Sequence, residues 1–383
     1  MVTGAYFPEI SGAGLQCRTL IRAAKGDGFS FSVVTTCLDK TLPFRDSVEG
    51  VPVYRLPAGA RGRLGTLCCW LPKLFYLFFK ELLRADVIHL HGISLKSYFF
   101  LTVGFIFKKL VLLKMTSLGE DDPAYIRQRS RLRAFFFRLA DYYLAPSPAL
   151  EKAYRKQGSR PERLFYLPNG VDTRRFCPVT EDEKRDLRSQ LGLPPDELLI
   201  IFTGHYSLDK RPHFLVEVWS ELKITGVGLV LLGSSAPGSF EVSPEVVRRV
   251  NEIAEKSPLP GHLITVQYAG RIEDYYRAGD IFALPSVREG MPNALLEAMA
   301  SGLACVATRL EGITDILFRK ENCGILFQAD SREELGEAIE KLVEDPALRK
   351  ELGAKARAKV CADYDIHRLA RNYRDFVSRA ARA

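Results

Sequence analysis

The stretch from Ser286 to Gly302 reads SVREGMPNALLEAMASG and carries two glutamates, Glu289 and Glu297, eight positions apart. A short apolar run, IFALP, precedes it, and an Ala/Leu/Met helix pattern follows Pro292. Because proline suits the first position of a helix, we expect Glu289 in a loop between a strand and a helix. Glu297 would then lie one to two turns inside that helix. A carboxylate in each place could accept hydrogen bonds from ligand hydroxyls.

The mouth of the same helix could bind an anion. Backbone amides around Asn293 would have no acceptor within the helix, and the helix dipole adds partial positive charge there. Ligands of open α/β sheets collect beyond the carboxyl ends of strands, where this loop is expected. A diphosphate at the helix mouth, a sugar beside Glu289 and a ribose beside Glu297 would fit the spacing. Spacing alone is also compatible with an ordinary solvated helix face.

Strand and helix patterns alternate along the whole chain, which predicts an α/β fold with parallel sheets. The predicted strands are residues 31–36, 53–56, 87–91, 110–115, 142–146, 163–167, 198–204, 228–233, 263–269, 281–285, 304–307 and 324–327, and the helices named with them are 14–25, 71–84 and 213–222. The pattern predicts two doubly wound, Rossmann-like domains facing a cleft.

The domain boundary is placed at residues 168–178, PNGVDTRRFCP, which are rich in turn formers and lack periodicity. We expect an N-terminal domain over residues 1–168 and a linker over 169–180. The C-terminal domain would cover residues 181–363, with a last helix over 364–383 packing back on the first domain. A chain of 383 residues is long for one core, which agrees with two domains.

Charge is divided unevenly along the chain. Residues 1–172 contain 25 Lys and Arg against 14 Asp and Glu, whereas the remainder contains 29 against 32. A basic half joined to a near-neutral half indicates that the first half meets something anionic.

The eight cysteines form no C-x-x-C pair and lie mostly in apolar runs, which favours reduced, buried thiols in a cytosolic protein. The N-terminus has no signal-peptide pattern, and the longest early apolar stretch is too short to span a bilayer.

The motifs quoted above give the sequence a strong resemblance to the retaining glycosyltransferases of the GT-B family 4. That family carries a Glu, seven residues and a second Glu in a stretch like EGMPNALLEAMASG. The likeness extends to PNGVDTRRF, DVIHLHG, GDIFALPS and EDPALRKELGAKAR, and so covers nearly the whole chain. The resemblance implies the GT-B architecture and a nucleoside diphosphate sugar donor, and it does not name the sugar, the base or the acceptor.

The resemblance also implies roles for individual residues. Glu289 would contact the donor sugar and act in catalysis, Glu297 would hold the ribose, and Lys210 would pair with the diphosphate. The remaining donor-side residues implied are Gly12, Gly14, His205, Arg271, Gly290, Met291, Pro292 and Asn293. A tight SGAG loop at Gly12 and Gly14 could equally open a dinucleotide-binding unit, although G-x-G-x-x-G is absent.

The sequence departs from the family pattern in three places. His205 stands where many relatives have Arg, and its charge depends on pH. Leu118 stands where relatives often have a histidine near the acceptor, so the function of that histidine is either absent here or supplied elsewhere, for example as a catalytic function of Asp121 or Asp122. Met1 falls inside the expected first strand, which would make this strand short or place the native start upstream.

Other polar residues of the first half suggest the acceptor side. His89 and His91 alternate on a predicted strand and share a face; without a third ligand at useful spacing, we expect His91 to line the acceptor site and no metal to bind. Glu120, Asp121 and Asp122, in GEDDP, are read as acceptor-side residues, with loop or helix capping as the alternative. Because a lysine and the N-terminus of a helix are already expected to compensate the negative charge of the diphosphate, we expect neither a cofactor nor a metal.

Residues 67–84, LCCWLPKLFYLFFKELLR, are unusually apolar and aromatic. They could form a helix packed on the sheet or an interfacial helix on an anionic membrane, which the basic first half favours. No nucleic-acid motif is present, so no nucleic-acid partner is expected.

The sequence as a whole predicts a cytoplasmic enzyme, peripheral on the inner face of the membrane. It would move a sugar from a nucleoside diphosphate sugar to a hydroxyl of a glycan or lipid-linked glycan, with retention. The alternatives are a sugar-phosphate or sucrose/glycogen-type synthase with a soluble acceptor, and a non-catalytic nucleotide-sugar-binding subunit.

Overall fold

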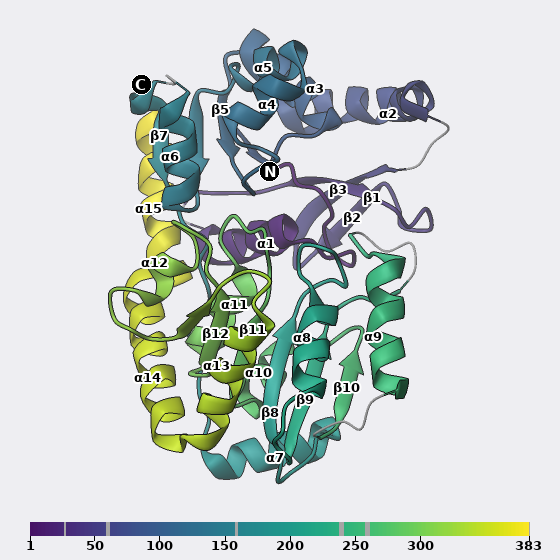
Figure 1. Cartoon of the computed structure of the whole chain (residues 1–383). Coiled ribbons are helices and arrows are strands. Elements are labelled where there is room, and N and C mark those ends of the chain that lie inside the picture. Colours follow the sequence, from purple (N-terminus) through teal and green to yellow (C-terminus); the bar gives the residue numbers. More distant parts are fainter. Residues whose placement is uncertain (27, 59–61, 158–159, 237–240, 257–260, 383) are drawn as a thin grey trace. The chain divides into compact units, whose positions relative to one another are not determined.

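The computed structural model describes residues 1–382 except 27, 59–61, 158–159, 237–240 and 257–260, and the side chains of residues 62–64 and 256 are also left out (Figure 1). The chain forms two compact units. Unit 1 consists of Met1–Asn169 and Ile366–Ala383, and unit 2 consists of Gly170–Asp365. The chain therefore leaves unit 1 once and returns to it with its last helix.

Unit 1 is built on a largely parallel sheet. Its strands are β1 (Val33–Cys37), β2 (Arg45–Val48), β3 (Val51–Pro57), β4 (Val87–His91), β5 (Leu110–Lys114), β6 (Tyr142–Ala145) and β7 (Leu164–Tyr166). They run in the orders β1-β3-β2 and β4-β5-β6-β7. Val2 joins the two parts because it bridges both Val34 and Leu90. The carboxyl ends of β1, β4, β5 and β6 therefore share one edge.

The helices of unit 1 cover both faces of this sheet. They are α1 (Gly12–Ala24), α2 (Gly62–Leu77), the π-helical turn η1 (Phe78–Leu82), α3 (Leu95–Ile106), α4 (Pro123–Arg129), α5 (Arg131–Phe137), α6 (Pro148–Lys156) and α15 (Ile366–Ala380), with a 3₁₀ turn η2 (Pro161–Arg163). One core cluster joins α1 and α15 to the β5 and β6 side chains Leu112 and Leu144. On α15, Phe376 stacks on Phe165 of β7 with ring centroids 4.1 Å apart. Apolar packing thus holds the last helix on unit 1.

Unit 2 contains one six-stranded sheet in the order β10-β9-β8-β11-β12-β13, and every pairing in it is parallel. Its strands are β8 (Leu198–Thr203), β9 (Val227–Leu232), β10 (Leu263–Val266), β11 (Ile281–Leu284), β12 (Ala304–Thr308) and β13 (Ile325–Phe327). Its helices are α7 (Glu181–Leu191), α8 (Pro212–Ser220), α9 (Pro244–Lys256), α10 (Ile272–Ala278), α11 (Asn293–Ala300), α12 (Asp315–Phe318), α13 (Arg332–Glu344) and α14 (Pro346–Asp363). Two apolar clusters lie on the two faces of the sheet, as a buried parallel sheet requires.

Asp280, in the GDIFALPS motif, has a structural role that follows from its hydrogen bonds and ion pairs. Its Oδ2 accepts from Arg188 Nη2 at 2.7 Å and from the backbone amide of Leu199 at 2.7 Å, and Lys184 pairs with its Oδ1. Arg188 also donates to the carbonyl of Ala278 at 3.0 Å. This network fixes the start of β11 to β8 and α7, and so sets the register of the strand that leads to Glu289.

The predicted α/β class with parallel sheets is confirmed, and each predicted strand has a counterpart within a few residues. The antiparallel strand β2 was not predicted, because its four residues carry a polar, half-exposed pattern. Pro292 is the N-cap of α11 rather than its first residue, and the helix begins at Asn293. No helix among the described residues is long and apolar enough to cross a bilayer.

Candidate functional site

Two loops at the carboxyl edge of the unit 2 sheet bring Lys210 and Glu289 together. Lys210 follows β8 and Glu289 follows β11, and these strands are neighbours in the sheet. Lys210 Nζ lies 2.6 Å from Glu289 Oε1. The Glu289 residue is only 7% exposed, so its negative charge is compensated mainly by this one cation. The sequence places the two residues 79 positions apart, and strand adjacency alone makes them neighbours.

Further contacts hold the two loops in this arrangement. The amide of Val287 donates to the carbonyl of Asp209 at 2.9 Å, and Arg288 Nη2 pairs with Asp209 Oδ2 at 2.5 Å. The amide of Lys210 donates to Ser207 Oγ at 3.2 Å. Asp209 and Arg288 were not identified from the sequence, because charged loop residues carry no periodic signal.

Glu297 lies in the second turn of α11 and is 7% exposed. The hydroxyl of Tyr276, on α10, donates to Glu297 Oε2 at 2.9 Å. Burial raises the pKa of the Glu297 carboxyl to about 7, although the Tyr276 hydrogen bond and the charge of Arg175 act in the opposite direction. Glu297 therefore titrates near neutral pH, and its ability to accept hydrogen bonds depends on pH.

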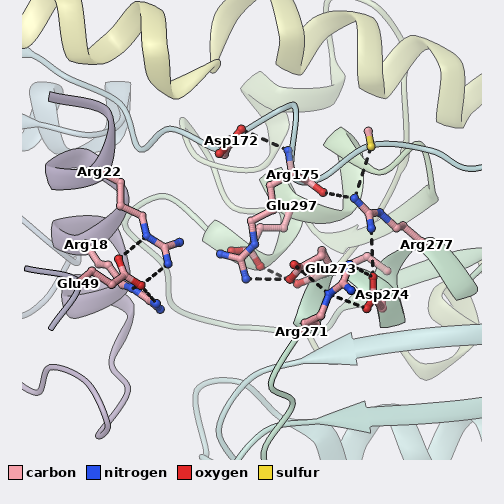
Figure 2. Close-up of polar contacts among 12 residues, drawn as sticks. Arg18, Arg22, Glu49, Asp172, Arg175, Arg271, Glu273, Asp274, Arg277 and Glu297 are labelled. Atoms are coloured by element: carbon pink, nitrogen blue, oxygen red, sulfur yellow. Dashed lines mark hydrogen bonds and ion pairs between the residues drawn. The ribbon is translucent and has the colours of Figure 1, made fainter. Parts of the chain in front are cut away.

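A chain of ion pairs surrounds Glu297 in unit 2 (Figure 2). Arg175 Nη2 pairs with Glu273 Oε2 at 2.8 Å, and Arg277 Nη2 donates to the carbonyl of Arg175 at 2.7 Å. Arg277 Nη1 also reaches Asp274 Oδ1 at 3.1 Å. These contacts tie the PNGVDTRRF segment to α10. The sequence predicted this segment as a linker within the family likeness, and the charge that Arg175 contributes near Glu297 was not predicted.

Arg271 is the N-cap of α10, and its side chain is 69% exposed. Its Nε lies 3.0 Å from Asp274 Oδ2, so it belongs to the edge of the same cluster (Figure 2). The predicted role of Arg271 beside the nucleotide base stays a prediction.

The remaining predicted donor-side residues of unit 2 lie on the same two loops. Gly290, Met291 and Pro292 are buried between Glu289 and α11, and Asn293 is the first residue of α11. His205 follows Gly204 directly after β8 and is half-buried. The first turn of an α-helix has no intrahelical acceptor for its amides, and α11 begins four positions after Glu289. Anion binding at this helix mouth stays a prediction.

Gly12 and Gly14 begin α1 in unit 1. Ser11 Oγ caps the helix by accepting from the Gly14 amide at 3.0 Å, and it donates to the carbonyl of Ala5 at 2.9 Å. A Cβ on Gly14 would lie 2.1 Å from the Ala5 oxygen, so a side chain there would collide with the backbone. Close packing accounts for Gly14, and a role toward phosphates stays a prediction.

The same helix carries an arginine clamp, drawn with the cluster of unit 2 in the second figure. Arg22 Nε lies 2.6 Å from Glu49 Oε2 and Arg18 Nε lies 3.1 Å from Glu49 Oε1 (Figure 2). The hydrogen bond from Arg22, with that from Arg18, lowers the pKa of Glu49 to about 2. The clamp fixes the β2–β3 turn to α1.

Asp121 and Asp122 both have structural partners in unit 1. Asp122 is the N-cap of α4, and its carboxylate accepts from the amides of Tyr125 at 3.0 Å and Gly119 at 2.7 Å. Asp121 accepts from the amides of Ile93 and Thr116, both at 3.2 Å, and from the Thr116 hydroxyl. The capping alternative therefore describes Asp122, while a catalytic role for either residue stays a prediction. Glu120 is exposed beside them.

His91 ends β4 and is 6% exposed. Its ring stacks on His89 with centroids 4.4 Å apart, and His89 Nδ1 lies 3.0 Å from the Tyr373 hydroxyl. Burial, and then the charge of Lys114, lowers the pKa of His91 well below its usual value, so the imidazole is neutral at pH 7. Its position at the carboxyl edge of β4 fits the predicted acceptor side.

Comparison with known proteins identifies two domains. Residues 183–359 match the model described as "Glycosyl transferases group 1", and residues 11–170 match "Glycosyl transferase 4-like domain". A D-inositol 3-phosphate glycosyltransferase from Rhodococcus erythropolis is 28% identical over 82% of this chain and 74% of its own length. For several other curated relatives, the chain spans about half of the relative's length.

Two solved structures support the fold. Sucrose-phosphate synthase from Thermosynechococcus elongatus superposes with a TM-score of 0.80 at 22% identity, covering 99% of this chain and 98% of that one. Anabaena HepE in complex with UDP-glucose gives a TM-score of 0.78 at 18% identity, with 98% of both chains covered. These structures confirm the predicted GT-B architecture, and the domain models with the curated relative support a glycosyltransferase of the EC 2.4 class.

Proposed function

Because this chain carries both domains of a GT-B glycosyltransferase, we propose that it moves a sugar from a nucleoside diphosphate sugar to a hydroxyl of a glycan or lipid-linked glycan, with retention of configuration. The observation that carries the proposal is the Lys210–Glu289 pair. Glu289 lies four positions before α11, and the second turn of that helix carries the buried Glu297. HepE was solved in complex with UDP-glucose, which makes a uridine nucleotide sugar the first donor to test.

Each residue of this site has a distinct proposed task. Lys210 and the first turn of α11 bind the diphosphate. Glu289 binds hydroxyls of the sugar that is transferred, and Glu297 accepts hydrogen bonds from the vicinal hydroxyls of the ribose. Gly12, Gly14, His205 and Arg271, with residues 290–293, complete the donor site. On the acceptor side we retain His91 and Glu120, with Asp121 and Asp122 in the catalytic set.

We propose attack on the same face of the sugar from which the diphosphate leaves. The acceptor oxygen forms a bond to the anomeric carbon while the bond from that carbon to the diphosphate breaks. The acceptor proton passes to the departing phosphate oxygen, so charge and atoms balance without a covalent enzyme intermediate. Lys210 and the helix mouth stabilise the negative charge that develops on the diphosphate. No metal or other cofactor is part of this proposal.

The test begins with a thermal-shift screen of nucleoside diphosphate sugars, followed by transfer assays with the donor that stabilises the protein. NMR coupling constants across the new glycosidic bond should report the configuration of the donor sugar. An inverted product would overturn the same-face step.

Transfer to a soluble sugar phosphate would favour the synthase alternative. Donor binding without hydrolysis or transfer, across lipid-linked and soluble acceptors, would indicate a binding subunit. We propose a cytoplasmic location at the inner face of the membrane, with the donor and the glycan acceptor as partners and no nucleic acid.

A further inference from the structure

The helix formed by α2 and η1 is apolar on both sides. Trp70, Leu74 and Leu77 are buried against the core of unit 1, as expected for a helix that covers a sheet. The opposite side should then be polar, because surface helices of globular proteins are amphipathic. Instead, that side presents a strip at four-residue spacing, with exposures from 42% to 67%: Leu67, Leu71, Phe75, Phe79 and Leu83.

The π-helical turn keeps this strip in line. In an α-helix, positions four residues apart drift by about 40° around the axis with each step. A π turn has more residues per turn, so a step of four residues there falls short of a full turn and reverses the drift. The turn η1 covers Phe78–Leu82 and therefore includes Phe79. Phe75 and Phe79 remain adjacent, with ring centroids 4.7 Å apart.

The strip continues onto neighbouring helices of unit 1. At the end of α3, Phe105, Ile106 and Phe107 are 66%, 62% and 45% exposed, and Phe107 lies 5.0 Å from the Phe78 ring. On α5, Leu132 and Phe135 are 61% and 58% exposed, and α5 meets α3 through the Tyr98–Phe136 stack. Figure 1 shows α2, α3, α4 and α5 along one side of the unit.

Basic side chains accompany these apolar residues. Between residues 65 and 140, eight exposed residues are Lys or Arg and two are Asp or Glu. Lys80 and Arg84 flank Phe79 and Leu83, and Lys108 follows Phe107. Glu81, the acidic residue within this helix, is turned toward the Tyr54 hydroxyl, which donates to its Oε1 at 2.6 Å. Exposed apolar side chains ringed by cations match an anionic bilayer, where rings enter the interface and ammonium groups meet phosphate.

We propose that α2, η1, the end of α3 and α5 form a docking face that inserts apolar side chains into the interface of an anionic lipid bilayer. This inference rests on the proposed location at the membrane and deepens it by naming the face that enters the lipid, and its test needs neither donor nor acceptor. Peripheral attachment of this kind would leave the helix lying in the interface rather than crossing the bilayer. It also specifies which residues enter the lipid, and this makes it testable residue by residue.

The first experiment measures co-sedimentation with large vesicles of phosphatidylcholine alone or mixed with phosphatidylglycerol. The wild-type protein should bind the anionic vesicles and be released by high salt. Phe75→Ser/Phe79→Ser should lower the partition coefficient at least tenfold. Lys80→Glu/Arg84→Glu should lower it more than 20-fold, because each basic group near an anionic surface contributes about fivefold.

Matched controls lie in unit 2. Tyr268→Ser removes an aromatic side chain that is 69% exposed, and Lys341→Glu/Lys350→Glu reverses two exposed charges. Neither should change vesicle binding. Thermal unfolding and size-exclusion chromatography of every variant separate lost binding from lost folding.

Two native cysteines give an independent measurement. Cys68 is exposed next to the strip and Cys361 is exposed on α14. In a background with Cys69→Ser and Cys177→Ser, because both thiols are partly exposed, an environment-sensitive fluorophore on Cys68 with Cys361→Ser should shift to the blue on anionic vesicles. The same fluorophore on Cys361 with Cys68→Ser should not shift. Equal shifts, no shift, or equal loss of binding in the controls would overturn the proposal. So would a dimer that the Phe75/Phe79 change dissociates, since the strip would then be an interface between two copies.

Discussion

Lys210 Nζ and Glu289 Oε1 form an ion pair at 2.6 Å between two loops that follow adjacent strands. The pair joins the cation assigned to the diphosphate with the carboxylate assigned to the sugar. A donor that engages both must redistribute these contacts, so removing one charge alters the environment of the other. This coupling makes the two glutamates of the EGMPNALLE stretch separable by experiment.

Glu289→Gln should lower turnover and leave affinity for the bare nucleoside diphosphate nearly unchanged, because Lys210 remains available to phosphate. Glu297→Gln should lower the affinity for the nucleoside diphosphate by about 10- to 100-fold, since charge-assisted hydrogen bonds contribute about 1.5–3 kcal/mol each. Calorimetry of nucleotide binding beside steady-state kinetics checks both. The opposite pattern would mean that the two carboxylate roles are exchanged.

Nucleotide affinity should rise with pH through the neutral range. The free Glu297 carboxyl has a pKa of about 7, and the carboxylate accepts from ribose hydroxyls through stronger, charge-assisted hydrogen bonds than the protonated form, which has lost one acceptor site. Below pH 7 the protonated form dominates and binding must displace its proton, so affinity falls by up to about tenfold between pH 8 and pH 6. Calorimetry in buffers of different ionisation enthalpy should also show proton release. Glu297→Gln serves as the control, and a pH slope that persists in it would assign the titration to another group.

Tyr276→Phe should shift this pH profile upward. The Tyr276 hydroxyl donates to Glu297 Oε2 at 2.9 Å and lowers the pKa of that carboxyl. Without it, the protonated form persists to higher pH, and nucleotide affinity at pH 7 drops a few-fold. The free energy of unfolding should fall by about 1 kcal/mol, the typical contribution of one hydrogen bond. If the midpoint of the pH profile of nucleotide affinity stays unchanged while the free energy of unfolding falls, Tyr276 has a packing role only.

Asp122 can be tested with a pair of substitutions. Asp122→Asn keeps a good N-cap for α4 and removes the charge, whereas Asp122→Ala removes both and should cost about 1 kcal/mol of stability. If the carboxylate acts in catalysis, both variants lose turnover while Asp122→Asn keeps its melting temperature. Full activity in Asp122→Asn would restrict this residue to capping.

Transfer activity should survive EDTA, because Lys210 and the first turn of α11 provide the positive charge that the diphosphate requires. The measurement is the initial rate before and after chelation and dialysis, with Lys210→Met as a variant that should lose at least tenfold in nucleoside diphosphate affinity. Activity that disappears with EDTA and returns with Mg²⁺ or Mn²⁺ would contradict this assignment.

Local patterns in the sequence located all the described strands but one and several of the helices. The apolar run at residues 281–284 and the helix after Pro292 were located because burial in a parallel sheet and helical periodicity leave direct traces in residue order. The short strand Arg45–Val48 was missed, since its alternating, half-exposed side chains give little signal. The exposed side of residues 67–83 could not be separated from the buried side by composition, because both are apolar.

The sequence by itself determined the α/β class, the two carboxylates on either side of a helix mouth, and the cation expected near them. Only the tertiary structure decided which groups meet. Lys210 reaches Glu289 because β8 and β11 are adjacent, and Tyr276 and Arg175 approach Glu297 because α10 packs beside α11. Periodicity reports how each segment faces the core, whereas the pairing of polar side chains distant in sequence depends on strand order and helix packing. The pKa of Glu297 likewise arises from burial that no local pattern encodes.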